Sequence, residues 1–236
     1  MKKTTGIVAG VMLLFLLLAG CRMMADHTSQ EAPSQEKAKK KYYVAAFDEI
    51  EINGVADVVF SQSRKVGIEV EGPENYLPYV VIESHKGVLE VNTRSIGNKR
   101  AGKGLQVKIS GPELKRVVNR GVGNFRTSSD LKQDYLQLDN YGVGSMRLQH
   151  IECDRLEVNS AGVGNFRLSG KARTVRYKAS GVGDINAKEL KAERVTLIHT
   201  GVGYITCYGS QLVDIKSKGV GDIKYYGNPE QVNKAR

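Results

Sequence analysis

A repeated Gly-Val-Gly motif constrains the fold of this chain more than any other feature of its sequence. The motif occurs six times, at intervals of 21, 20, 19, 20 and 18 residues. Its copies begin at Gly121, Gly142, Gly162, Gly181, Gly201 and Gly219. A period near 20 residues holds two or three short strands with their turns, and it is too short for a helical repeat pair or a propeller blade. Each repeat therefore predicts one coil of a β-solenoid.

Apolar residues alternate with polar ones on both sides of the motif, as in strands with one buried face. The fifth residue of each copy is apolar, and so is the residue four places before its first glycine. The two sets are Phe125, Met146, Phe166, Ile185, Ile205 and Ile223, and Val117, Leu138, Val158, Tyr177, Leu197 and Ile215. We predict an all-β, right-handed parallel β-helix with roughly 20 residues per coil.

The two glycines of each copy have a mechanical explanation. At a corner the chain needs a positive φ or a close approach to the neighbouring coil, and glycine meets both demands at low cost. The central valines are expected to form one inward ladder of apolar side chains. These residues are Val122, Val143, Val163, Val182, Val202 and Val220.

The repeat also predicts the limits of one domain, over residues 43–229. A divergent early copy starts at Gly54, and the regular coils occupy residues 111–229. Within the irregular part, residues 43–110, strand-like runs persist and a short helix or turn is expected at residues 74–79. The runs cover residues 66–70, 88–91 and 105–109. Residues 225–229 are expected to cap the last coil, whose edge would otherwise be unpaired, and residues 230–236 to form a tail.

The N-terminus has the features of an export signal. Lys2 and Lys3 precede an apolar run that is too short to span a bilayer, and Leu18-Ala19-Gly20-Cys21 follows it. This quartet resembles the lipobox of bacterial lipoproteins, which implies removal of residues 1–20 and lipidation of Cys21. An ordinary signal peptide with an incidental cysteine is the alternative, and the mass of the mature N-terminus separates the two.

Residues 21–42 are polar and end in a lysine cluster, which predicts a disordered tether between a membrane anchor and the folded domain. The cluster is either a solvated spacer or a contact for anionic headgroups. Removing Lys2 and Lys3 lowers the formal charge of +10 by two, to +8. An exported chain rarely meets nucleic acid, so we expect anionic glycans or lipid headgroups as contacts.

No metal, cofactor or disulfide is expected from the remaining cysteines and histidines. Cys153 and Cys207 lie between two and three predicted coils apart, at least roughly 10 Å at the usual strand spacing. Both are expected to fill space in the core. The four histidines share no ligand spacing with cysteines or carboxylates, so no metal site is predicted.

Two sets of polar residues near the corners are candidate ligand-binding residues. The residue after each motif is usually Asn, Asp or Ser, including Asn124, Asn165, Asp184 and Asp222. Stacked side chains of this kind can bind a cation or a glycan, or they can hydrogen-bond to backbone at the turns.

Two residues beyond this position stand Arg126, Arg147 and Arg167 in successive repeats. If they point outward, an anionic partner would ease their mutual repulsion. The alternative is a solvated face on which nearby acids pair with them.

No catalytic arrangement can be assembled from the local sequence. No copy of the motif continues to the third glycine of a nucleotide-binding loop. Some β-helix enzymes use paired carboxylates on polysaccharides, but Asp184 and Asp222 are expected two coils apart, on the order of 10 Å. We therefore predict no enzyme activity, and a polysaccharide-acting enzyme remains the less favoured alternative.

Several segments together resemble one known family. Residues 47–58, Gly111-Pro-Glu-Leu-Lys-Arg-Val, the Gly-Val-Gly-Asx turns and the closing Tyr-Gly-Asn-Pro look like the head GIN domain family of auto-transporter adhesins. The resemblance covers residues 44–229. It implies an exported β-helical domain and an adhesive role, and it supplies no catalytic residues.

The combined prediction is a noncatalytic lipoprotein of the outer membrane or cell surface, held to the membrane by its lipid anchor. Its repetitive face would bind a glycan or an envelope protein, without a cofactor. A structural component of the envelope is the alternative. A glycan array separates the two, because a structural component shows no selective binding.

Overall fold

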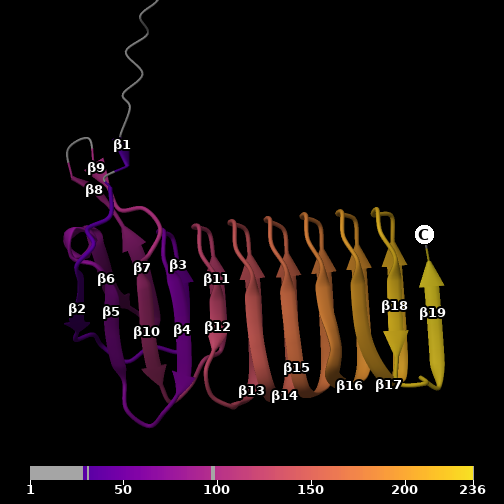
Figure 1. The fold of residues 1–236 in the computed structure, drawn as a ribbon. Coiled ribbons are helices and arrows are strands. Elements are labelled where there is room, and N and C mark those ends of the chain that lie inside the picture. The colour runs from indigo at the N-terminus through magenta and orange to yellow at the C-terminus, as the bar shows by residue number, and fades with distance from the viewer. Residues whose placement is uncertain (1–28, 31, 97–98, 236) are drawn as a thin grey trace, which may run out of the picture.

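The chain folds as a β-solenoid, shown as a computed structural model in Figure 1. The structure describes residues 29–30, 32–96 and 99–235. About six turns of about 20 residues stack on one another. In Figure 1 these coils stand side by side from β11 (Arg116–Asn119) to β19 (Gln231–Ala235). The predicted all-β class, parallel stacking and coil length are confirmed.

The regular coils are built from strands that pair in parallel and in register. Each long strand starts just after one corner and ends at the next, so that Phe166 lies opposite Ile185 and Tyr177 opposite Leu197. The bounds are β11 (Arg116–Asn119), β12 (Phe125–Thr127), β13 (Leu131–Asn140), β14 (Met146–Ser160), β15 (Phe166–Ala179), β16 (Ile185–His199), β17 (Ile205–Ser217), β18 (Ile223–Tyr226) and β19 (Gln231–Ala235).

The N-terminal part is less regular than the coils, and most of its strands belong to the same sheet as the coils. The expected strand-like runs correspond to β5, β7 and β10, and the expected short helix is the 3-10 helix η1. The bounds are β1 (Ser29–Gln30), β2 (Lys37–Tyr42), β3 (Glu49–Ile52), β4 (Asp57–Gln62), β5 (Gly67–Pro73), η1 (Glu74–Tyr79), β6 (Val80–His85), β7 (Val88–Thr93), β8 (Ser95–Ile96), β9 (Lys99–Arg100) and β10 (Gln106–Gly111).

The pairing of these strands gives the molecule two long faces. One, the arginine face, contains β2, β5, β10, β4, β12, the first parts of β14 to β17, and β18. The other, the network face, contains β6, β7, β3, β11, the last parts of β13 to β17, and β19. The first corner is the early copy of the motif, because Val55 bridges Val122.

Apolar columns fill the space between the two faces. Phe125, Met146, Phe166, Ile185 and Ile205 stack in register and are buried. The column before the corners is buried as well, from Val117 through Tyr177 to Ile215. The predicted inward positions on both sides of the motif are therefore confirmed, and burial of these columns is the main stabilising contribution to the fold.

The glycines allow neighbouring corners to touch backbone to backbone. A Cβ on Gly181 would lie 2.7 Å from the carbonyl carbon of Ala161 in the coil below. Gly183 has a φ of +140°, and a Cβ there would lie 2.7 Å from the carbonyl carbon of Gly164. The predicted reasons for the two glycines, close approach and positive φ, are both present.

The prediction that the central valines point inward is wrong. They bridge one another along the stack, but their side chains are exposed; that of Val182, for example, is 51% exposed. Counting alternate residues back from buried Phe125 places Gly123 and Gly121 inside and Val122 outside. The six valines thus form an external ridge. The inward position two residues before the first glycine of a motif holds a small or polar residue instead, such as buried Asn140 before Gly142.

Both ends of the solenoid extend beyond the predicted domain. The expected tether includes β2, which pairs antiparallel with β5, and the expected tail includes β19, which pairs with β17. Residues 225–229 therefore continue the last coil. Lys234 occupies the inward column opposite Ile215, and its ammonium lies 5.0 Å from the ring centre of Tyr225. A charge in this inward position protects the terminal edge from pairing with another strand.

Cys153 and Cys207 are free and buried, as the predicted core role requires. Burial raises the pKa of each thiol to about 12. Cys21 and the expected signal peptide lie outside the described residues. Within the described part of the chain, no helix is long and apolar enough to cross a membrane.

Candidate functional site

Arg126, Arg147 and Arg167 lie on adjacent strands of the arginine face, directly opposite one another. Their side chains, here called the arginine row, are all exposed. In-register pairing sets their Cα atoms about 4.8 Å apart. The line continues through Asn186 and Thr206 to Lys224.

The arginine row has no acidic partners among the described residues, in contrast to Arg116, Arg120, Arg155 and Arg173. Exposed arginines such as Arg176 and Arg194 likewise form no ion pair within the described chain, but neither lies directly opposite another arginine. None of its three members forms an ion pair with a described residue. On the network face, by contrast, Arg116 and Arg120 are both paired with carboxylates. The row therefore presents like charges without internal compensation, which favours an anionic partner.

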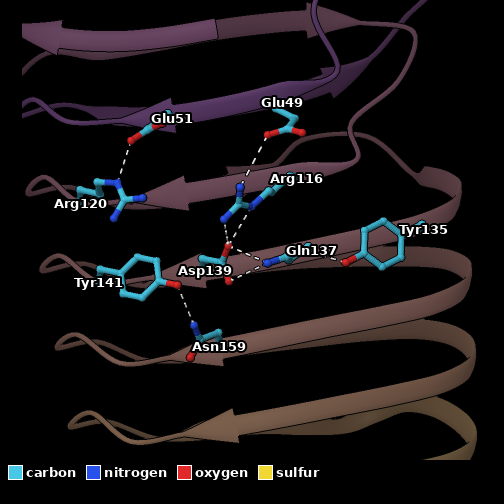
Figure 2. A network of polar contacts seen from close by, with 9 residues as sticks. All are labelled: Glu49, Glu51, Arg116, Arg120, Tyr135, Gln137, Asp139, Tyr141 and Asn159. Atoms are coloured by element: carbon cyan, nitrogen blue, oxygen red, sulfur yellow. Dashed lines mark hydrogen bonds and ion pairs between the residues drawn. The ribbon is translucent and has the colours of Figure 1, made fainter. Parts of the chain in front are cut away.

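Polar contacts join neighbouring strands of the network face, and a connected group of them centres on Asp139 (Figure 2). Asp139, which is 1% exposed, accepts hydrogen bonds from Arg116 Nε at 2.9 Å and Nη2 at 2.8 Å. Gln137 donates to the same carboxylate at 2.9 Å. Burial lowers the pKa of Arg116, but the hydrogen bond and charge of Asp139 raise it by more. These groups satisfy one another, so the network contributes to stability and leaves no free charge for a ligand.

The side chains that follow the corners act as links between coils. The Asn124 amide oxygen accepts a hydrogen bond from Ser145 N at 3.0 Å, and Asn165 Oδ1 accepts one from Asp184 N at 2.7 Å. Asp184 Oδ1 in turn accepts from Tyr204 N at 2.8 Å. The backbone bonding expected as the alternative is thus present, although it runs to the next coil. These hydrogen bonds occupy one side-chain oxygen each of Asn124, Asn165 and Asp184, and a cation or glycan would need those oxygens.

This relay ends at Tyr204, whose side chain provides no equivalent acceptor for Asp222. Asp222 is exposed, and its carboxylate forms no hydrogen bond to a described residue. Asp184 and Asp222 therefore differ in environment, and the coil that contains Tyr204 separates them. Among the described residues, no group of three or more His, Cys, Asp or Glu side chains is placed to hold a metal ion.

The sequence did not identify the residues that extend the arginine row toward the N-terminus. Strand pairing places Lys41, Glu69, Lys108 and Val59 in line with Arg126. Lys108 Nζ lies 2.8 Å from the carboxylate of Glu71, and this hydrogen bond and charge hold the pKa of Glu71 below its ordinary value. This alignment depends on pairing between segments that are distant in the sequence, so no local sequence pattern predicts it.

A family model described as "Putative auto-transporter adhesin, head GIN domain" matches residues 46–229. No curated protein matches the chain. The match extends over most of the described solenoid, from just before β3 to the turn that precedes β19.

Solved structures share the fold over most of the chain. The crystal structure of a putative adhesin from Bacteroides fragilis NCTC 9343 has a TM-score of 0.79 and 29% identity, covering 88% of this chain and 96% of the other. A putative lipid binding protein from Parabacteroides distasonis ATCC 8503 has a TM-score of 0.66 and 23% identity, covering 88% of this chain and 100% of the other. At 23% identity the second structure supports the fold alone.

Proposed function

This chain belongs to the head GIN domain family, and we propose that it is a noncatalytic, adhesin-like binding module whose arginine row binds an anionic glycan. Its family membership supports a surface or exported protein of adhesin type. The single observation that carries the binding site is the unpaired, exposed row of Arg126, Arg147 and Arg167.

The geometry of the row fits an extended polyanion. The three guanidinium groups project from rungs about 4.8 Å apart, a spacing comparable to one sugar residue along a glycan chain. Each guanidinium can bind a carboxylate through two parallel hydrogen bonds. A chain with regularly spaced acidic groups can therefore contact several arginines at once, which adds avidity to weak single contacts.

The proposed location follows from the N-terminal sequence. In this proposal Cys21 is lipidated and residues 1–20 are removed, so that the solenoid is displayed from the outer membrane or cell surface. Because β1 (Ser29–Gln30) already pairs with β9 and β2 begins at Lys37, only residues 21–28 are left as the tether in this proposal. An anchored module with a rigid, repetitive face is suited to binding an extended partner.

The test compares two variants with the same loss of charge. Replacing Arg126, Arg147 and Arg167 with glutamine should weaken binding to polygalacturonate at least tenfold, or about 1.4 kcal/mol. The control replaces Arg173, Arg176 and Arg194, exposed arginines outside the row, and should change affinity less than threefold. Equal losses in both variants would show a nonspecific charge effect and reject the row as the site.

Anionic lipid vesicles provide the second probe, because anionic headgroups also attract exposed arginines. Vesicles of phosphatidylserine and phosphatidylcholine should bind the full chain more weakly than polygalacturonate does. If vesicles bind more tightly and depend on the row, the partner is a lipid surface and the glycan proposal fails. A structural envelope component would show no selective binding to either probe.

A further inference from the structure

A hollow of about 570 Å³ opens at the N-terminal end of the arginine row. Its volume lies within the range of small-ligand sites, about 300–1,000 Å³. Arg126 forms one part of its wall, and Lys41 and Lys108 form others. The hollow is therefore continuous with the proposed glycan-binding row, and the inference drawn from it rests on that proposed function.

The hollow lies where small residues stand among longer ones on the outer side of the arginine face. The small residues are Val59, Ser61, Gly67 and Ser110, and they share that side with Glu69 and Lys108. Lys41 and Arg126 lie four strands apart across the sheet, about 19 Å at the usual spacing. The depression between them can accept more than one sugar ring.

The floor of the hollow is apolar and its rim is polar. The side chain of Val59, which is 7% exposed, forms the apolar floor, whereas those of Ile68 and Ile109 point into the core on the opposite face of the sheet. Ser110 donates a hydrogen bond to the Lys65 carbonyl oxygen at 3.1 Å, which leaves its hydroxyl oxygen able to accept. An apolar floor with hydroxyls around it suits a sugar ring, which has C–H groups on its faces and hydroxyls at its edge.

The charges around the hollow select among anionic sugars. Lys41 and Arg126 form no ion pair with a described residue, whereas Lys108 is paired with Glu71. Glu69 adds a carboxylate to the wall and lies 3.4 Å from Lys39 Nζ. Two uncompensated cations beside a carboxylate favour a ligand with one charge per sugar and free hydroxyls, and they disfavour a densely sulfated one.

We propose that this hollow binds the first residues of a uronic acid oligosaccharide, whose chain then runs along the arginine row. A carboxylate of the sugar pairs with Arg126, and a sugar hydroxyl donates to Glu69. The ring stacks its C–H face on Val59. The hollow thus gives the row a defined starting point and determines which sugar chemistry is accepted.

Titration calorimetry on the purified full chain tests this inference with galacturonic acid dimer and decamer. Ser61→Phe, which fills the hollow, should weaken dimer binding at least tenfold, and Lys41→Gln should weaken it at least threefold. Lys37→Gln is the matched control, since it removes the same charge from the same strand outside the hollow, and should leave dimer affinity unchanged. Replacing both Arg147 and Arg167 with glutamine should weaken only the decamer.

The outcomes separate this inference from the proposed function. If the dimer fails to bind, or binds equally well to Lys41→Gln and Lys37→Gln, the hollow is not a uronic acid site, even if decamer binding still needs Arg147 and Arg167. Tighter binding of a sulfated dimer would also overturn it. If replacing Arg147 and Arg167 leaves the decamer affinity unchanged, the proposed function itself fails. Lys41 is exposed, so its variant keeps the test valid should Ser61→Phe not fold.

Discussion

Replacing Gly183 with alanine should destabilise the domain by about 3–5 kcal/mol, a large part of the stability of a single domain. The corner is built so that Gly183 lies directly on Gly164 of the coil below. No rotation of a side chain can relieve this contact, because both partners are backbone. The expected cost therefore has two parts, backbone strain and loss of pairing between coils.

The magnitude follows from the geometry of the corner. A φ of +140° is unfavourable for alanine and costs about 1–3 kcal/mol. The overlapping Cβ also forces the two coils apart. This movement stretches the two hydrogen bonds that join these coils, from Gly164 N to the Val182 oxygen at 2.9 Å and from Val182 N to the Gly162 oxygen at 3.0 Å, at about 1 kcal/mol each.

Urea unfolding followed by circular dichroism measures the effect, with the m value checked for constancy. The matched control is Val182→Thr, one residue away at an exposed position, which should change the free energy of unfolding by less than about 0.5 kcal/mol. A loss below 1 kcal/mol for Gly183→Ala would refute the backbone stacking argument. A loss above 2 kcal/mol for Val182→Thr would show that the valines stabilise the stack.

Three further predictions concern the core, the network face and the anchor. The unfolded chain releases the Cys153 and Cys207 thiol protons near the ordinary pKa of about 8.5, below the folded value of about 12. Stability should thus fall as pH rises from 9 to 12, and thermal melts of the double alanine variant should show a shallower fall; an unchanged slope would contradict this. Asp139→Ala leaves Arg116 and Gln137 without their acceptor and should cost about 1–3 kcal/mol in urea unfolding; a neutral effect would show that the network is dispensable. Mass spectrometry of the mature protein should find diacylglycerol on an N-terminal Cys21, and an unmodified cysteine would exclude lipidation.

The repeat predicts the fold because its period, its alternation of apolar and polar residues and its glycines all indicate the same structure. The period sets the coil, the alternation sets the buried columns, and the glycines mark where coils touch. The inward prediction for the valines fails because the alternation, and not apolar character, sets the direction of each side chain: Val122 lies outside between inward Gly121 and Gly123. Val117 and Phe125, four residues on either side of Gly121, carry the inward phase in the sequence, whereas the burial of polar Asn119 in that phase is seen only in the structure.

The hollow was beyond prediction from the sequence for a different reason. It requires the register of β2 on β5, β5 on β10 and β10 on β4, segments that carry no repeat. The polar composition of residues 21–42 predicts a tether, and nothing in it marks the lysines as a strand. Pairing with the acidic strand β5, where Lys39 reaches Glu69 and Glu71, gives them a fixed place in the sheet.

Arginine footprinting of the unmodified protein tests the central claim most directly. Phenylglyoxal labelling followed by mass spectrometry compares each arginine with and without galacturonate decamer. Arg126, Arg147 and Arg167 should be protected together, while Arg173 and Arg176 should react at unchanged rates. Protection that is absent from the row, or equal at Arg173 and Arg176, would contradict a binding site on the arginine face.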